Sequence, residues 1–375
     1  MTDVSIVGNR KALMSLVPFL LLIVLSLPLH PGAVDAAPAT GQMATLGPGP
    51  KVTLQWVAQS IPTNLQYTLV EKRFAEEIAR RSNGRVEVRL ATWAELSLTG
   101  FEILRLTRQG QVEVGGAPFT NLAGDVPLLD IVDLPGLNPT IAQARKVLDV
   151  TSQEINRALA LLDVKLIGSW PFPANVFFCR VPVRGLEDMR GKRIRTFGPA
   201  LPDLVRALGA QSVTVAFPEL YTATERGVID CLITGTASAN QLKLYEVTTH
   251  IYSLPVTWST SGYLVNLRWW TSLPSDVRRF LEETFKEITA EQWKLGERLT
   301  QDGIDCNTGS AACQYGTRAT RPMVEVKPTD EARTTLRRIL GEVVIPGWVR
   351  RCGERCGSIY NRLVAPITNV PYGSR

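Results

Sequence analysis

One arginine at the end of a short strand is the residue whose position suggests chemistry. The segment Leu186-Glu-Asp-Met-Arg-Gly-Lys-Arg-Ile-Arg195 begins as a turn rich in charge and glycine, and it continues into a short strand that ends at Arg195. Arginine stays ionised, and its planar guanidinium matches a carboxylate with two parallel hydrogen bonds. The pattern therefore suggests that Arg195 captures a small organic acid.

The familiar motifs of catalysis and nucleotide binding are absent from the sequence. It contains no Gly-x-Ser-x-Gly, Gly-x-x-x-x-Gly-Lys or Gly-x-Gly-x-x-Gly pattern. Of its two histidines, His30 falls in the predicted signal peptide, so a catalytic histidine would have to be His250. Acids such as Glu71 and the pair Glu76 and Glu77 fall on helix faces expected to be exposed. We therefore expect no enzyme activity and no cofactor.

Six cysteines in an exported chain are expected to oxidise. The pairs that are local in sequence, Cys306 with Cys313 and Cys352 with Cys356, are the simplest assignment among three possible pairings of these four. An all-cysteine zinc site is the less favoured alternative, and we expect no metal. Cys179 and Cys231 lie in apolar, strand-like runs and form either a third bridge or two buried thiols.

The N-terminus has the pattern of a secretory signal peptide. Arg10 and Lys11 precede an uncharged, mostly apolar run, and small residues follow it, so residues 1–36 are predicted to be removed. An uncleaved membrane anchor is the alternative. Residues 37–50 are expected to form a flexible leader, and the protein is expected in the periplasm. The net charge of +6 comes from dispersed residues, which disfavours nucleic-acid binding.

Strands and helices alternate along the rest of the sequence. The hydrophobic spacing and the glycine stops predict strands at 52–57, 85–90, 112–114, 192–195, 213–215 and 228–233, with helices at about 69–81, 101–107, 201–208 and 218–226. A long amphipathic helix is expected at 274–299 and another at about 330–340. Alternation of this kind predicts an α/β fold built from βαβ units with parallel pairing, and two such halves would enclose a cleft.

An ordered set of motifs resembles one known family. The motifs are Ser82-Asn-Gly-Arg-Val-Glu-Val88, the segment that ends at Arg195, Leu208-Gly-Ala210, Glu219-Leu-Tyr221, Arg226-Gly-Val-Ile-Asp230, Asn266, and Trp270 through Leu273-Pro274. In order and spacing they are similar to the substrate-binding receptors of tripartite ATP-independent periplasmic (TRAP) transporters, the DctP-type family. The resemblance runs from about residue 51 to residue 348.

This resemblance implies a periplasmic-binding-protein-like fold of two lobes, braced by a long helix. We assign 51–172 to lobe I and 173–262 to lobe II. Residues 263–375 are expected to return to lobe I, with the long bracing helix and a C-terminal extension that contains cysteines. The implied function is to bind a small organic acid, a monocarboxylate or a dicarboxylate, and to deliver it to the membrane permease subunits.

The resemblance also assigns ligand-binding positions. It implies that Arg195 holds the ligand carboxylate, that Phe217 packs on the ligand, and that Thr234 contacts it. Sialic-acid receptors of this family carry a second arginine about twenty residues before the first, and here that position falls near Asn175. A sialic-acid ligand is therefore disfavoured.

The aromatic side chains expected near the cleft favour an acid with an apolar or aromatic body. They are Trp93, Trp170, Phe172 and Phe217. The sequence is also compatible with two other functions. The same fold could serve an ABC importer or a sensor, and the chain could be a secreted enzyme that acts on carboxylic acids.

Overall fold

The computed structural model describes residues 45–373. The predicted signal peptide, 1–36, and residues 37–44 of the predicted leader lie outside the described residues. The rest of that leader is anchored. Leu46 is buried, its backbone N–H donates to the carbonyl of Arg81, and Asn83 donates to the carbonyl of Leu46. Within residues 45–50, which were expected to belong to a flexible leader, these contacts place Leu46 against the end of α1 (Lys72–Arg81).

The first lobe is built on a five-stranded sheet with the order β2-β1-β3-β10-β4. β1 pairs in parallel with β2 and β3, whereas β10 is antiparallel to β3 and β4. The strands are β1 (Val52–Val57), β2 (Val86–Ala91), β3 (Val114–Pro118), β4 (Val164–Trp170) and β10 (Ser261–Asn266).

The second lobe is built on a six-stranded sheet with the order β11-β9-β5-β8-β6-β7. β6 is parallel to β7 and β8, whereas β5 is antiparallel to β8 and β9. The strands are β5 (Asn175–Cys179), β6 (Arg193–Thr196), β7 (Gln211–Thr214), β8 (Cys231–Gly235), β9 (His250–Thr257) and β11 (Val324–Val326).

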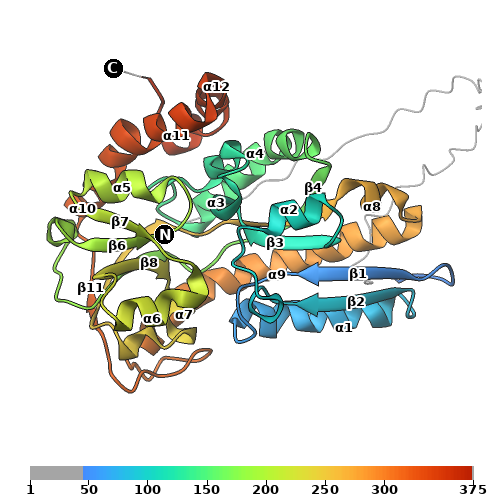
Figure 1. Cartoon of the computed structure of the whole chain (residues 1–375), viewed down its shortest axis with the longest axis horizontal. Coiled ribbons are helices and arrows are strands. Elements are labelled where there is room, and N and C mark those ends of the chain that lie inside the picture. Colours follow the sequence, from blue (N-terminus) through green and yellow to red (C-terminus); the bar gives the residue numbers. More distant parts are fainter. Residues whose placement is uncertain (1–44, 374–375) are drawn as a thin grey trace, which may run out of the picture. The chain divides into compact units, whose positions relative to one another are not determined.

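Helices follow the strands in both lobes (Figure 1). Among the described residues they are α1 (Lys72–Arg81), α2 (Ile103–Arg108), α3 (Phe119–Leu122), α4 (Ile141–Ala160), α5 (Leu201–Ala207), α6 (Leu220–Glu225), α7 (Thr236–Gln241), α8 (Leu267–Ser272), α9 (Ser275–Asn307), α10 (Asp330–Ile339), α11 (Ile345–Cys352), α12 (Glu354–Leu363) and α13 (Ala365–Thr368). No helix within residues 45–373 is both long and apolar enough to span a bilayer.

The predicted α/β architecture with two lobes is confirmed, but uniform parallel pairing is not. The antiparallel strands β5 and β10 are buried along their whole length. Such strands show no alternation of polar and apolar residues, so the sequence carried no sign of their direction. The expected return of 263–375 to lobe I is also only partly right, because β11 joins the second sheet. Three residues are too few for a strand pattern to be recognised.

The long helix α9 spans both lobes, as expected (Figure 1). In the first lobe, the hydroxyl of Thr289 accepts a hydrogen bond from the backbone N–H of Ser169 on β4. In the second lobe, Asn307 Nδ2 donates to the carbonyl of Thr236 at the start of α7. Gly303 lies so close to α7 that a Cβ atom there would collide with its backbone. The helix is therefore fixed to both lobes.

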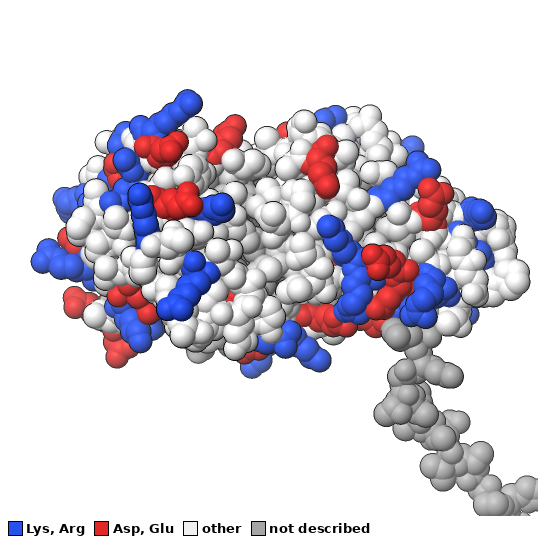
Figure 2. All heavy atoms as spheres, turned by 90° about the horizontal axis from the view of Figure 1, so that it is seen from below, with Lys and Arg blue, Asp and Glu red and all other residues white. Residues whose placement is uncertain are grey.

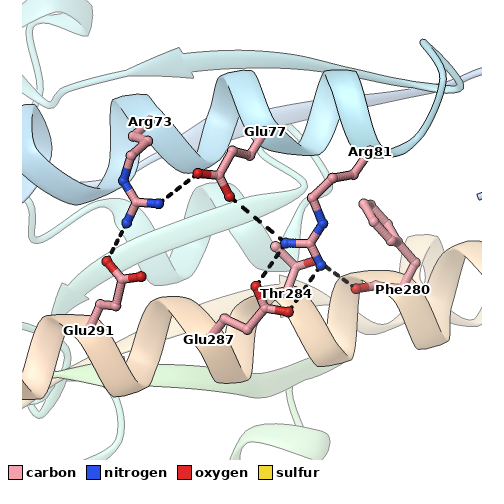
Figure 3. Close-up of polar contacts among 7 residues, drawn as sticks. All are labelled: Arg73, Glu77, Arg81, Phe280, Thr284, Glu287 and Glu291. Atoms are coloured by element: carbon pink, nitrogen blue, oxygen red, sulfur yellow. Dashed lines mark hydrogen bonds and ion pairs between the residues drawn. The ribbon is translucent and has the colours of Figure 1, made fainter. Parts of the chain in front are cut away.

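Ion pairs join α1 to α9 within the first lobe (Figure 3). Arg81 is nearly fully buried and binds Glu287 with two hydrogen bonds of 2.8 and 3.0 Å. Its guanidinium also lies 5.5 Å from the centre of the Phe280 ring. Arg73, near the start of α1, contacts Glu77 and Glu291, and its side chain is 42% exposed. One buried and one exposed arginine thus hold the same two helices.

The C-terminal helices α11 and α12 contact both lobes. Arg351 donates to Asp203 on α5 of the second lobe at 2.7 Å. Trp348 is fully buried, and its indole N–H donates to the carbonyl of Pro127 in the first lobe at 2.7 Å. From α12, Arg362 reaches Glu154 on α4 at 2.6 Å. These helices form a second bridge between the lobes (Figure 1).

Three disulfides are formed. Cys306 pairs with Cys313 and Cys352 pairs with Cys356, as expected from their closeness in sequence. Cys179 pairs with Cys231, and this bridge joins β5 to β8 at directly paired positions. The bridge lies at one end of this strand pair, and Asn175 and Thr234 at the other end line a cavity.

Candidate ligand-binding site

A cavity lies between the two lobes, with about 520 Å³ of empty space, part of it open to solvent. The residues that the first lobe contributes follow the ends of its strands or begin its helices. They are Ser60, Trp93, Thr99, Phe101, Pro118 and Asn121. This position agrees with the general rule that open α/β sheets bind ligands beyond the carboxyl ends of their strands.

The second lobe contributes the only charge in the cavity lining. Its residues come from β6 and β8, from the segment before α6, and from the start of α7. They are Arg195, Phe197, Ala216, Phe217, Thr234, Gly235 and Ser238. Phe172, Asn175 and Ser259 complete the lining where the chain crosses between the lobes. The cavity therefore combines one cation with aromatic walls and uncharged polar groups.

Arg195 is held by backbone carbonyls and not by an acid. Its Nε donates to the carbonyl of Val215 at 2.9 Å and its Nη1 to that of Ile233 at 2.8 Å. Only 3% of the residue is exposed, and its guanidinium lies 4.5 Å from the centre of the Phe197 ring. Within residues 45–373, no carboxylate oxygen lies within 4.0 Å of it. Arg195 therefore forms no salt bridge between the lobes within the described residues.

Burial without a counter-ion sets the electrostatics of Arg195. Desolvation lowers the pKa of Arg195 to about 9. The group therefore remains protonated at neutral pH, as a buried cation whose Nη2 donors have no partner in the described part of the chain. A buried charge of this kind is costly unless an anion reaches it.

The neighbouring arginine on the same strand has a different role. Side chains alternate along a strand, so Ile194 points to one face of β6 and its two neighbours point to the other. Arg193 and Arg195 therefore share a face, but Arg193 lies at the strand's start. There Asp230 accepts hydrogen bonds from its backbone N–H and its guanidinium. Asp230 thus orients Arg193 outside the cavity.

Asn175 is fixed by the segment that crosses between the lobes. Its Nδ2 donates to the hydroxyls of Thr257, at 2.9 Å, and Ser259, at 2.7 Å. Asp133 in turn accepts hydrogen bonds from the backbone N–H groups of Trp258 and Thr260. Burial raises the pKa of Asp133 to about 7, against the opposing effect of these hydrogen bonds. The crossing segment and Asn175 are therefore held as one unit.

The chain is also similar in sequence to known proteins. The family model for bacterial extracellular solute-binding proteins, family 7 (DctP), matches residues 58–307, more than half of the chain. The chain belongs to the DctP family. A solute-binding protein of Sulfitobacter sp. (strain NAS-14.1) is 24% identical over 241 residues, which cover 64% of this chain and 72% of the relative. The C4-dicarboxylate-binding periplasmic protein DctP of Rhodobacter capsulatus is 29% identical over 229 residues, which cover 58% and 66%.

Solved DctP-family structures have the same fold. The receptor DctP7 of Bordetella pertussis, which binds pyroglutamic acid, matches with a TM-score of 0.73 and 21% identity over 82% of this chain and 98% of that one. A TRAP periplasmic solute-binding protein of Desulfovibrio salexigens, with bound orotic acid, gives a TM-score of 0.75 and 20% identity over 84% and 100%.

The structure brings together most of the site residues that the sequence suggested for this DctP-family chain. The six that line one cavity are Trp93, Phe172, Asn175, Arg195, Phe217 and Thr234. Trp170 does not line it, so its assignment is corrected. Its ring is fully buried and lies 4.2 Å from the ring of Tyr263, between the first sheet and α9. Trp170 still belongs to β4, whereas Phe172 lies beyond the strand end and reaches the cavity.

Sequence reasoning missed several lining residues. Phe197 comes two positions after Arg195, at the carboxyl end of the same strand, and that spacing could have identified it. Phe101, Asn121 and Ser259 lie in loops or at a helix start, where no periodicity predicts the direction of a side chain. Their positions depend on how the two lobes meet.

A direct contact between the lobes lies beside the cavity. Gly198 follows β6 with a φ of +68°, and a Cβ atom there would lie 2.6 Å from the carbonyl oxygen of Thr120 on α3 and collide with its hydroxyl. Glycine therefore serves two needs at this position, a left-handed backbone and a close approach of the two lobes.

We expect Gly198→Ala to weaken ligand binding about tenfold or more, because the added methyl group forces the lobes apart. Gly191→Ala is the matched control, since Gly191 has a similar φ of +74° but nothing within 4 Å of an added Cβ. Both variants carry the same backbone strain, so only the first should lose affinity in isothermal titration. Equal affinities for the two variants would show that this contact does not govern binding.

Proposed function

We propose that this chain is a periplasmic receptor that binds a small organic acid and delivers it to a TRAP-type secondary transporter. The observation that carries the proposal is Arg195, a buried guanidinium without a carboxylate partner in the described chain, which lines a cavity between two lobes. An anionic ligand supplies the counter-ion that residues 45–373 do not provide. The ligand carboxylate binds the remaining N–H donors of this guanidinium.

The free energies involved are consistent with a receptor. A hydrogen bond to a charged group contributes about 1.5–3 kcal/mol, whereas micromolar binding needs about 8 kcal/mol. Burial of apolar ligand surface adds about 25 cal/mol per Å². Phe172, Phe197 and Phe217 offer such surface in the cavity. This lining supports an acid with an apolar or aromatic body.

The cavity offers little for catalysis. No residue that lines it is a histidine, cysteine or acid, so a general base or an activated nucleophile is missing there. His250 lies on β9 and its Nδ1 shares a hydrogen bond with the Thr249 hydroxyl. The family consists of solute-binding proteins. We therefore assign no enzyme activity to the chain.

The proposed location follows from the N-terminal sequence and from relatives. Residues 1–36 are proposed as a cleaved signal peptide, and the relative DctP of Rhodobacter capsulatus is named a periplasmic protein. On the face drawn in Figure 2, positive and negative side chains are interspersed. This distribution offers no single basic surface for nucleic acid on that face.

The direct test is native mass spectrometry of the purified protein, followed by a thermal-shift screen of organic acids. We expect a bound acid of low molecular mass, and an increase in melting temperature with a subset of carboxylates. An acid recovered unchanged after incubation agrees with a receptor, whereas its conversion would identify an enzyme. If neutral sugars or amines stabilised the protein and no acid did, the proposal would be wrong.

A further inference from the structure

The cavity can neutralise only one negative charge. Arg195 is the only ionisable residue among those that line it. One ligand carboxylate would leave the site neutral, but a second one would be buried with no cation beside it. Burial of an unpaired carboxylate is strongly unfavourable. The polar groups that remain, such as Asn121 and Thr99, are uncharged.

Asn175 presents a hydrogen-bond acceptor with no partner of its own. Both protons of Nδ2 are directed to the crossing segment, where Thr257 and Ser259 accept them. The amide cannot be turned over, because Oδ1 would then face the carbonyl oxygen of Thr257, which lies 3.3 Å from the present Nδ2. No donor in residues 45–373 reaches Oδ1, although the residue is almost fully buried.

Arg195 and Asn175 lie far enough apart to contact different parts of one ligand. They belong to β6 and β5, and β8 lies between these strands. Neighbouring strands are about 4.8 Å apart, so the two backbones are separated by roughly 10 Å. Along β8 their partners, Gly235 and Leu232, also lie three positions apart. Both residues line the cavity, so they approach it from two separate strands.

We infer that the ligand has a single carboxylate, bound by Arg195, and a neutral N–H or O–H group that donates to Oδ1 of Asn175. This inference rests on the proposed function and narrows its ligand class. Asn175 is then a specificity-determining residue. It favours acids with a donor over acids without one, while the single charge of Arg195 excludes dicarboxylates.

A series of benzoates, which share one planar aromatic ring, tests both the single carboxylate and the neutral donor. Benzoate is compared by isothermal titration with its ortho, meta and para derivatives that carry a hydroxyl, a methoxyl or a second carboxylate. We expect at least one hydroxybenzoate to bind about fivefold or more tightly than benzoate and than its own methoxy derivative. We expect each benzenedicarboxylate to bind at least tenfold more weakly than benzoate.

The variant Asn175→Leu separates direct contact from a merely structural role. It should lower the affinity ratio of each preferred hydroxybenzoate over its methoxy derivative to about one, whatever happens to the affinity for benzoate. A structural role would weaken all the ligands alike. Asn121→Leu removes another amide from the lining and should keep the hydroxyl preference.

The outcomes distinguish this inference from the function on which it rests. Equal affinity for hydroxy and methoxy derivatives at every ring position, or tight binding of a dicarboxylate, would overturn the inference and leave the receptor function intact. Loss of the preference in Asn121→Leu but not in Asn175→Leu would also overturn it. If the wild type binds none of these benzoates, the result counts against the inference, whereas the receptor function is judged by the separate screen of organic acids.

Discussion

Replacement of Arg195 by alanine should abolish ligand binding while the chain remains folded. The substitution removes the only cation of the cavity lining, and with it two or more hydrogen bonds to the ligand carboxylate. At about 1.5–3 kcal/mol for each bond, the expected loss of affinity is roughly 10²- to 10⁴-fold. Isothermal titration with an acid that stabilises the wild type measures it.

The stability of the unliganded Arg195→Ala variant should change little. Two hydrogen bonds to backbone carbonyls are lost, but so is the cost of a buried charge without a counter-ion. Ligand-induced thermal stabilisation, in contrast, should disappear. Arg195→Lys keeps the charge but loses the planar pair of donors, so its affinity should fall strongly as well.

Arg193→Ala is the matched control on the same strand. Arg193 is 42% exposed and pairs with Asp230 outside the cavity. Its removal should leave the affinity within about twofold, because exposed ion pairs contribute only about 0–1 kcal/mol. Wild-type affinity in Arg195→Ala, or an equal loss in both variants, would refute the role assigned to Arg195.

The second large effect is expected at the contact between α1 and α9. Arg81→Ala should lower the free energy of unfolding by about 3 kcal/mol, since it breaks a partly buried ion pair with Glu287 and removes the contact with Phe280 (Figure 3). Only 1% of the Arg81 side chain is exposed. Urea denaturation of the purified variant measures the change.

Arg73→Ala provides the comparison on the same pair of helices. Arg73 contacts Glu77 and Glu291 from an exposed position, so its loss should cost about 1 kcal/mol or less. The two arginines form a similar number of ion pairs, but only the Arg81 side chain is buried. If both variants lost the same stability, burial would not be the property that distinguishes them.

The sequence identified residues that line the cavity better than it identified the directions of the strands. Arg195, Thr234 and Phe217 each lie at or just beyond a strand end, and a strand end has a fixed place in a βαβ unit. Strand direction was less accessible, because β5 and β10 are apolar on both faces. The family's spacing then supplied positions, such as Asn175, that periodicity alone does not mark.

The residues that escaped prediction depend on contacts between distant segments. Trp170 and Phe172 are two positions apart and equally aromatic, but β4 ends between them and they enter different environments. The close approach of Gly198 to Thr120 joins two lobes that no local pattern relates. Likewise, β11 pairs with β9, although α9 and its contacts with both lobes lie between the two strands in the sequence.

The bridge formed by α11 and α12 has a kinetic consequence. Because Arg351 holds the second lobe while Trp348 and Arg362 hold the first, any rotation that opens the cavity must break or rearrange some of these contacts. The free energy of these contacts therefore lowers the population of the conformation with an open cavity, and it raises the barrier to ligand dissociation. A longer residence time follows for the bound acid, and its release to a partner would require that partner to supply the energy of opening.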